Sequence, residues 1–261
     1  MLRTRITSAL IGIPLLLALL YLGGVYGYAL FVFLALGSLY EFNRVMRHQA
    51  MRPPIVTGYL ILVTILFSPI YPEKIFFPVL FLLVLGVVVV SVLTFPRTTW
   101  VDVAVNSFAS LYLGYLFSFG LRMLNMEQSF LVILLALLLT WSSDVGGYFI
   151  GKQWGKTKLA PRLSPKKTWE GAAGAIGLTV MVSFLSYYLM GPQPGLPAYL
   201  LLGVIASLAA QFGDLFMSNM KRYFGVKDAG NLIPGHGGLL DRFDSFMLVM
   251  PVVFFFFTYW G

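Results

Sequence analysis

Long apolar runs recur along the whole chain, and short polar segments separate them. A run of roughly 20 apolar residues can cross the ~30 Å hydrocarbon core of a membrane as an α-helix, and somewhat shorter runs can cross with help from flanking residues. The pattern predicts nine transmembrane helices, at residues 7–22, 26–42, 54–71, 76–95, 102–121, 129–150, 171–190, 198–220 and 243–260. The expected fold class is therefore all-α, a polytopic integral membrane helix bundle.

The pattern shows no separate soluble module, so we expect a single membrane domain over residues 1–261. Within this domain, we expect residues 1–128 to form the scaffold and dimerisation spans. Residues 129–261 are expected to form the catalytic spans and cytoplasmic loops. Prolines fall inside four predicted spans, where a helix bundle tolerates them as kinks: Pro14, Pro69, Pro78 and Pro251.

Two alternatives remain open at the N-terminus. The first two apolar runs are short and Gly23-Gly24 separates them, so they form either two spans or a hairpin lying partly in the membrane interface. Residues 1–22 also have the charge pattern of a signal peptide. We interpret them as the first membrane helix because no clear small-x-small cleavage site is present.

Composition and charge agree with a membrane protein. The chain is 59% hydrophobic and 11% charged, with a mean hydropathy of +0.85, whereas soluble domains have ~25% charged residues. Every Lys and Arg except Lys74 and Arg122 falls at the N-terminus or in every second loop after it. The positive-inside rule then predicts a cytoplasmic N-terminus and an external C-terminus. The basic loops would also attract anionic lipid headgroups.

Asp144, Asp214 and Asp244 fall at a similar depth in three separate predicted spans. At ~1.5 Å per residue, each lies ~22–25 Å from the outer end of its span. An ionised Asp costs on the order of 3 kcal/mol at the centre of a membrane helix, and three like charges repel one another. A divalent cation or Lys and Arg partners would remove both penalties. The alternative is three unrelated acids that snorkel or form ion pairs.

Helical spacing and residue type suggest which cation would bind. Two sets of polar residues share helix faces: Asp214, Ser218, Lys221 and Arg222, and also Asp241, Asp244 and Ser245. The chain has no Cys and its two His residues are far apart, which disfavours zinc. Mg²⁺ usually binds through one or two carboxylates together with substrate phosphates, so a phosphate substrate is expected. The candidate metal ligands are Asp144, Asp214, Asp241 and Asp244.

Two polar segments indicate phosphate binding. Residues 234–238 form a Gly-rich turn whose backbone N–H groups can face an anion, and His236 within it is a candidate phosphate contact or proton donor. In the other segment, Lys166 and Lys167 would act as point charges on a phosphate. A solvated basic loop is the alternative for this second segment, in which Trp169 is a candidate for stacking on a base.

The motif Ser218-x-x-Lys221-Arg222-x4-Lys227-Asp228-x-Gly230, followed by Pro234-Gly235-His236-Gly237-Gly238-x-x-Asp241-Arg242-x-Asp244, resembles the signature of the CDP-diacylglycerol synthases, or phosphatidate cytidylyltransferases. The stretches at residues 143–148 and 164–171 are also similar to that family. The resemblance covers residues 140–245, whereas residues 1–130 match only in being apolar spans. It implies transfer of CMP from CTP to phosphatidic acid, with release of pyrophosphate.

The resemblance and the residue chemistry together define the candidate site. The candidate catalytic residues are Asp214, Asp241, Asp244, Lys221 and His236. The candidate residues for binding substrate phosphates are Ser164, Lys166, Lys167, Thr168, Ser218, Arg222, Lys227, Gly235, Gly237, Gly238 and Arg242.

The resemblance implies Mg²⁺ as cofactor, with a second cation, K⁺ or another Mg²⁺, as a further expectation. The expected partners are CTP, phosphatidic acid, membrane lipids and a second copy of the chain in a homodimer; no nucleic acid is expected. The expected location is the cytoplasmic (inner) membrane, with the active site facing the cytoplasm. Two alternatives stay open: a CTP-dependent polyprenol or lipid kinase, and an ion-coupled membrane transporter.

Overall fold

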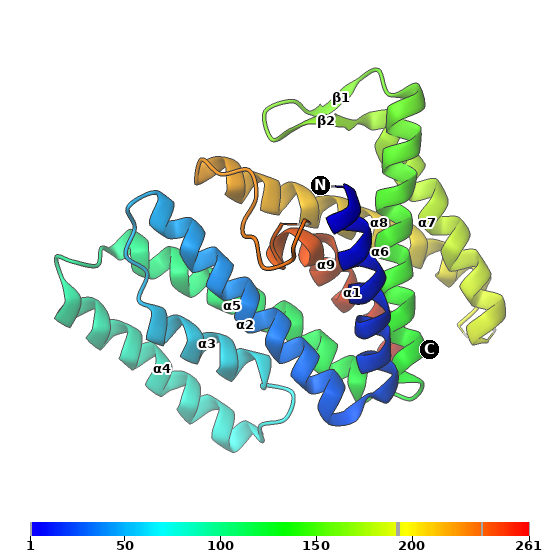
Figure 1. The fold of residues 1–261 in the computed structure, drawn as a ribbon. Coiled ribbons are helices and arrows are strands. Elements are labelled where there is room, and N and C mark those ends of the chain that lie inside the picture. Colours follow the sequence, from blue (N-terminus) through cyan, green and yellow to red (C-terminus); the bar gives the residue numbers. More distant parts are fainter. Residues whose placement is uncertain (1, 192–193, 236, 261) are drawn as a thin grey trace. The chain divides into compact units, whose positions relative to one another are not determined.

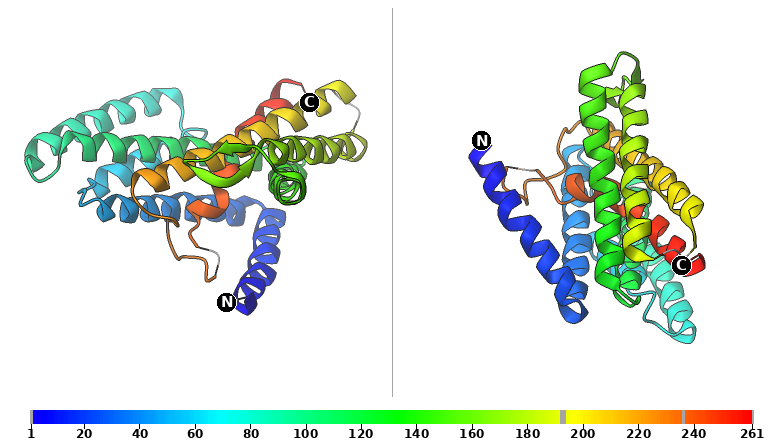
Figure 2. Two further views of the ribbon diagram at one scale, coloured as in Figure 1. Left: turned by 90° about the horizontal axis from the view of Figure 1, so that it is seen from above. Right: turned by 90° about the vertical axis from the view of Figure 1, so that its right-hand side faces the viewer.

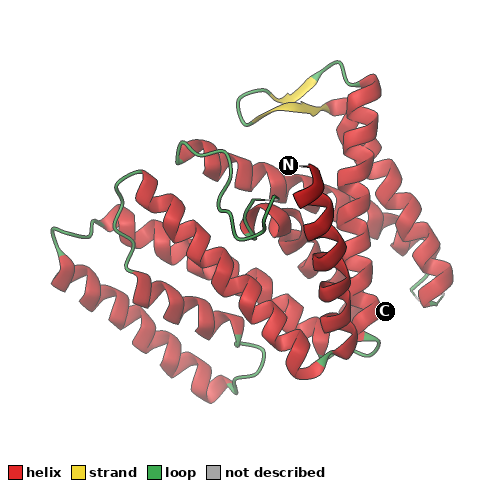
Figure 3. Ribbon diagram, viewed as in Figure 1, coloured by secondary structure: helices red, strands yellow, loops and turns green. Residues whose placement is uncertain are grey.

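The computed structural model describes residues 2–191, 194–235 and 237–260, which form nine α-helices and one two-stranded antiparallel sheet (Figures 1 and 3). The helices are α1 (Leu2–Leu22), α2 (Gly24–His48), α3 (Ile55–Leu66), α4 (Glu73–Thr94), α5 (Trp100–Leu124), α6 (Ser129–Trp154), α7 (Trp169–Met190), α8 (Leu196–Tyr223) and α9 (Leu240–Tyr259). The strands are β1 (Lys158–Ala160) and β2 (Ser164–Thr168). The predicted all-α membrane helix bundle is confirmed.

Each predicted span corresponds to one helix, but the helices begin and end at other residues than predicted. Six helices of the described chain are long and apolar enough to cross a membrane, namely α2, α4, α5, α6, α7 and α8. Helix α3 has 12 residues and is therefore ~18 Å long, shorter than the ~30 Å hydrocarbon core. The predicted helix over 54–71 is too long, because α3 ends at Leu66 and Pro69 follows it in a turn. Proline has no N–H group with which to continue a helix.

The chain divides into two compact units, each described here by itself. The first unit contains Met1–Asn125 and Tyr223–Arg242, and the second contains Met126–Arg222 and Phe243–Gly261. The first unit therefore holds α1 to α5 and the segment Tyr223–Arg242, which we call the signature segment. The second holds α6, α7, most of α8 and α9, and both strands. The proposed roles of residues 1–128 and 129–261 stay predictions.

The core of the first unit lies where α2, α3 and α5 pack side by side (Figures 1 and 2). Phe31 and Leu39 from α2 and Phe117 from α5 are fully buried there. A buried polar contact lies in this core, where Asn106 Nδ2 of α5 donates to Asn43 Oδ1 of α2 at 2.6 Å. Breaking this bond would cost stability, because it would leave a buried amide group without a hydrogen bond in apolar surroundings.

The helices of the second unit approach one another closely through glycines. Helices α6 and α7 run alongside each other over much of their length (Figure 2, right). A Cβ at Gly146 of α6 would lie 2.5 Å from the backbone oxygen of Gly174 in α7. A Cβ at Gly213 of α8 would lie 2.6 Å from the backbone oxygen of Asp244 in α9. Small residues thus let these backbones approach, as they commonly do in membrane bundles.

A β-hairpin connects α6 to α7, where the sequence predicted only a polar loop (Figures 1 and 3). The Glu170 carboxylate accepts the backbone N–H groups of Lys156 and Thr157 and so closes the base of the hairpin. Thr168 caps α7, because its Oγ1 accepts the N–H of Gly171 at 3.1 Å. The hairpin was missed because residues 158–168 lack the apolar and polar alternation that signals a strand.

Candidate functional site

A cavity of about 390 Å³ lies in the second unit, between α6, the hairpin, α7 and α8. Its volume falls in the range of small-molecule sites, ~300–1,000 Å³. The residues that line it are Ser143, Asp144, Gly147, Tyr148, Gly151, Lys152, Leu159, Lys166, Lys167, Thr168, Gly171, Ala172, Ala175, Gln211 and Asp214. Five predicted site residues therefore meet in one cavity: Asp144, Lys166, Lys167, Thr168 and Asp214. Ser164, at the start of β2, is not among the lining residues.

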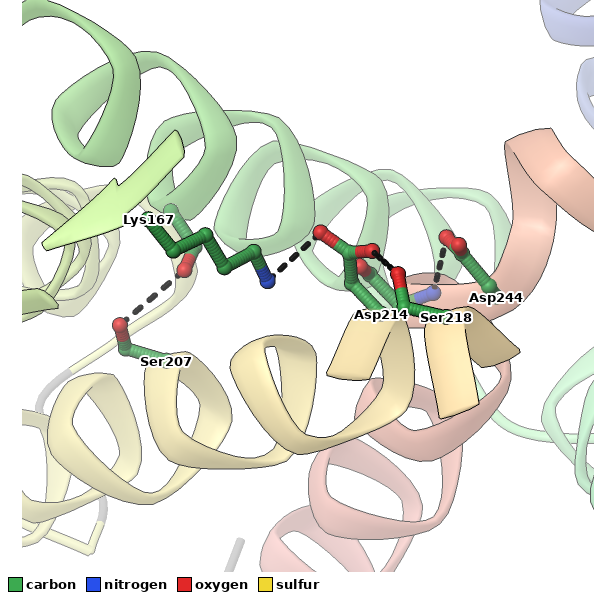
Figure 4. A network of polar contacts seen from close by, with 7 residues as sticks. Lys167, Ser207, Asp214, Ser218 and Asp244 are labelled. Carbon is green, nitrogen blue, oxygen red and sulfur yellow. Dashed lines mark hydrogen bonds and ion pairs between the residues drawn. The ribbon is translucent and has the colours of Figure 1, made fainter. Parts of the chain in front are cut away.

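An ion pair between Lys167 and Asp214 stands at this cavity (Figure 4). Lys167 Nζ, from β2, lies 2.6 Å from Asp214 Oδ2, from α8, and the two side chains are 25% and 33% exposed. Ser218 Oγ lies one helical turn further along α8 and donates to Asp214 Oδ1 at 3.2 Å. The tertiary structure thus joins a predicted phosphate ligand, Lys167, to a predicted metal ligand, Asp214.

Asp244 of α9 lies on the side of Asp214 away from Lys167 and is only 8% exposed (Figure 4). Its Oδ1 accepts the N–H of Ser245 at 2.7 Å (Figure 4). The Asp244 carboxyl group interacts electrostatically with Asp214 and Asp144, which repel it, and with Lys221, which attracts it. Three acids that the sequence placed at one depth are therefore electrostatically coupled, with two lysines among them.

The donor set of the second unit fits a hard cation that substrate phosphates help to bind. Among the residues that the structure describes, no three or more Asp, Glu or His side chains converge closely enough to hold a metal by themselves. Mg²⁺ commonly takes only one or two protein carboxylates and completes its shell with water and phosphate oxygens. Asp214 and Asp244, with Asp144 in electrostatic range, suit that mode. A metal pocket shared by all four predicted aspartates stays a prediction.

The last turn of α8 adds cationic groups to the same unit. Arg222 Nε donates to the backbone oxygen of Leu163 at 3.4 Å, which ties the end of α8 to the turn of the hairpin. Lys221, the preceding residue, acts on Asp244. Trp169, the candidate for base stacking, is 60% exposed and does not line the cavity.

A buried polar layer at the cavity was not among the predicted site residues. Ser143 and Ser207 share a hydrogen bond of 3.1 Å between their hydroxyl groups (Figure 4). Gln211 Nε2 donates to Ser207 Oγ at 3.2 Å and to the backbone oxygen of Ala172 at 3.4 Å. Gln211 precedes Asp214 by one helical turn, and this spacing was the signal that could have identified it.

The signature segment belongs to the first unit and is organised by Asp241. Asp241 Oδ2 accepts the backbone N–H of Ala229 at 2.8 Å and that of Gly238 at 3.1 Å. Gly235 and Gly237 have φ angles of 76° and 90°, a region that favours glycine. Asp241 therefore links Gly238, the last residue of the Gly-rich turn, to Ala229, which precedes the turn.

This segment also contains the other residues for which the sequence predicted phosphate binding or catalysis. Lys227 and Arg242 are exposed, and His236 lies outside the described residues. The N–H of Gly238 is directed at Asp241. The roles predicted for Asp241 as a metal ligand and for Gly235, Gly237, Gly238, Lys227 and Arg242 as phosphate ligands stay predictions.

One further acid contacts the signature segment and was not predicted. Glu41, in the interior of α2, is 1% exposed, and its Oε2 accepts the N–H of Leu240 at 2.9 Å. Its signal was present in the sequence, because an ionisable residue in an apolar helix is costly and marks a candidate functional position.

The fold and the site together define the class of protein: a polytopic membrane protein whose lysines, hydroxyl groups and carboxylates line one cavity, as suits a phosphate-bearing ligand. The sequence model of the Cytidylyltransferase family matches residues 3–260, and the chain belongs to that family. This confirms the family that the signature motif indicated.

Curated relatives match over most of their length. The phosphatidate cytidylyltransferase of Bacillus subtilis (strain 168) is 37% identical over 235 residues, which cover 85% of each chain. The phosphatidate cytidylyltransferase of a Synechocystis species is 33% identical over 285 residues, covering 97% of this chain and 95% of the relative. That of Staphylococcus aureus (strain COL) is 41% identical over 167 residues, or 62% of each chain.

Proposed function

We propose that the protein transfers the CMP group of CTP to phosphatidic acid, giving CDP-diacylglycerol and pyrophosphate for phospholipid synthesis. The observation that carries this proposal is the cavity of the second unit, where Lys167 and Asp214 meet beside Lys166 and Thr168. Cations and hydroxyl groups bind phosphate, and carboxylates bind the cation that a triphosphate brings. The names of the relatives supply the identity of both substrates.

The transfer reaction requires no covalent intermediate with the protein, because the phosphate of phosphatidic acid is itself the nucleophile. A phosphate oxygen of phosphatidic acid attacks the α-phosphorus of CTP, and a new P–O–P bond forms. The bond from the α-phosphorus to the bridging oxygen breaks, and its electron pair leaves with pyrophosphate. The second pKa of a phosphomonoester is ~6, so the attacking oxygen is already ionised at neutral pH. The enzyme therefore needs to position two anions and to stabilise the charge that develops on the leaving group.

The side chains of the second unit can perform both tasks. Lys166 and Lys167 would hold the triphosphate from the hairpin. Lys221 and Arg222, at the end of α8, would add positive charge near the departing pyrophosphate. In the present arrangement Lys167 is paired with Asp214, so phosphate binding would draw its ammonium group away from that carboxylate.

Mg²⁺ fits the Asp214 carboxylate that this exchange would release, together with the Asp244 carboxylate. Asp214 and Asp244 would bind it, with Asp144 in electrostatic range. When bound, the ion neutralises phosphate charge and polarises the α-phosphate. A second cation, K⁺ or Mg²⁺, would offset the remaining negative charge in the same way.

The membrane setting completes the proposal. The basic loops favour a site at the cytoplasmic face of the inner membrane, because the positive-inside rule predicts that basic loops face the cytoplasm. Phosphatidic acid would then reach the site laterally from the inner leaflet, leaving its acyl chains in lipid. A homodimer, assembled through the N-terminal spans, is part of the proposal.

One assay tests this function directly. Purified protein in lipid nanodiscs is given CTP labelled at the α-phosphate or in the base, phosphatidic acid and Mg²⁺, and the products are separated by thin-layer chromatography. We expect labelled CDP-diacylglycerol and an equal amount of pyrophosphate. Release of CDP with a phosphorylated lipid alcohol would instead identify a kinase. Ion flux in proteoliposomes without nucleotide turnover would identify a transporter.

A further inference from the structure

The signature segment docks onto one face of α2. A Cβ at Gly37 would overlap the side chain of Leu239, so the backbone of α2 lies close against the segment there. Further along α2, the ring of Phe42 meets that of Phe224 edge to face, with centroids 5.9 Å apart. Leu239 and Phe224 are each 4% exposed. Both ends of the segment are therefore anchored by apolar contacts to one helix of the same unit.

Between these contacts lies Glu41, a carboxylate in the interior of the unit. It is 1% exposed, and Asp241 acts on it electrostatically as a like charge. Placing a second carboxylate here is unfavourable unless hydrogen bonds hold it. Its Oε2 accepts the N–H of Leu240, the first residue of α9.

Glu41 also lies close against the backbone at two glycines of the signature segment, Gly230 and Gly238. A Cβ at Gly230 would overlap Glu41 Oε1, and a Cβ at Gly238 would overlap both carboxylate oxygens. Neither glycine has a φ angle in the left-handed region, so the backbone itself would accept another residue there. At each of these two positions, the three atoms nearest to an added Cβ all belong to the Glu41 side chain.

Two carboxylates thus accept hydrogen bonds from three backbone N–H groups of the signature segment. Asp241 accepts the N–H groups of Ala229 and Gly238, and Glu41 accepts that of Leu240. Hydrogen bonds to a carboxylate are roughly twice as strong as those between neutral groups. The three bonds together tie Ala229, the last residue of the Gly-rich turn and the first residue of α9 to two carboxylates.

We propose that Glu41 is a positioning residue for the transfer reaction: its carboxylate fixes the backbone of the signature segment and thereby the Gly-rich turn and Asp241. It touches neither substrate and acts through the segment. This inference rests on the proposed function for its catalytic consequence, whereas its structural content can be measured without substrate.

The first test compares E41Q with the wild-type protein in nanodiscs. Glutamine keeps the size of the side chain but removes the charge and replaces one acceptor oxygen with a donor group. We expect backbone amide exchange over residues 226–242 to become at least tenfold faster. We also expect kcat to fall at least tenfold, with the KM values for CTP and phosphatidic acid changing less than threefold. Unchanged exchange together with unchanged kcat would overturn the proposal.

Asn43→Ala provides the matched control, because Asn43 is a buried polar residue of the same helix whose side chain accepts a hydrogen bond from Asn106 of α5. This variant should lower thermal stability while leaving exchange in residues 226–242 and kcat near the wild-type values. If it reproduced both effects of E41Q, general loosening of the unit would explain them and Glu41 would have no positioning role.

A rescue experiment decides the matter even if E41Q does not accumulate as folded protein. Gly238→Ala should lower kcat because its Cβ displaces Glu41. Adding Glu41→Asp shortens the acid by one methylene and makes room, so the double variant should regain at least threefold activity over G238A. No recovery would refute the close fit. If no variant and no wild-type sample formed CDP-diacylglycerol, the proposed function would fail, while the exchange data would still decide the role of Glu41.

Discussion

Replacing Lys167 with glutamine separates a catalytic role for this residue from a purely structural one. Lys167 Nζ contacts Asp214 Oδ2 at 2.6 Å at the edge of the cavity. Glutamine keeps a flexible polar side chain, one bond shorter than that of lysine, but carries no charge. The change therefore removes the ion pair and the cation that would meet the triphosphate, while the hairpin strand that carries residue 167 remains intact.

The two roles predict losses of different size. Both partners are a quarter to a third exposed, so the ion pair contributes about 1 kcal/mol or less to stability. Asp214 also keeps the hydroxyl group of Ser218 as a donor. A hydrogen bond from a cation to a substrate phosphate is worth ~1.5–3 kcal/mol, which corresponds to a roughly 10- to 140-fold loss in kcat/KM.

The assay measures kcat/KM for CTP in nanodiscs and the thermal unfolding midpoint of the same samples. We expect K167Q to lose activity in that range and to unfold within a few degrees of the wild type. Lys158→Gln is the control, because Lys158 is an exposed lysine of β1 that does not line the cavity. Equal losses in K158Q and K167Q, or no loss in K167Q, would show that the hairpin lysines are only a solvated basic surface.

Three further predictions concern the same unit. Asp214→Asn should raise the Mg²⁺ concentration for half-maximal activity at least tenfold, and excess chelator should abolish wild-type activity; full activity in chelator would exclude the metal. Gly213→Ala places a Cβ 2.6 Å from a backbone oxygen of α9 and should lower stability by ~1–3 kcal/mol in detergent unfolding. Gly177→Ala, with no neighbouring atom within 4 Å, should be neutral or stabilising by up to ~1 kcal/mol; equal effects would contradict the packing argument. Glu170→Ala should speed trypsin cleavage at Lys156, because the base of the hairpin loses its acceptor; an unchanged cleavage rate would count against that role.

The sequence alone determined the class of this protein and the places of its helices. In a membrane every backbone polar group needs an internal partner, so an apolar run of sufficient length has little choice but to become a helix. The nine apolar runs accordingly appear as nine helices of the described chain. Helix ends were less predictable, as α3 shows, because a turn before Pro69 ends the helix while the sequence is still apolar.

The chemistry of the site was also visible in the sequence, because charged residues in apolar surroundings are rare and costly. That argument identified Asp144, Asp214 and Asp244, which the structure couples electrostatically. The same argument applied to Glu41, but one acid at the end of a predicted span gave no indication of its partner.

The tertiary structure decided which residues meet. Lys167 and Asp214 are 47 positions apart in the sequence, and Glu41 and Leu240 are 199 positions apart. No local pattern records such pairs, because each depends on how separate helices pack. The hairpin was likewise decided by a side chain outside its strands, since Glu170 accepts the N–H groups at its base. Residue types determined what the site can bind, and packing decided which of those residues share it.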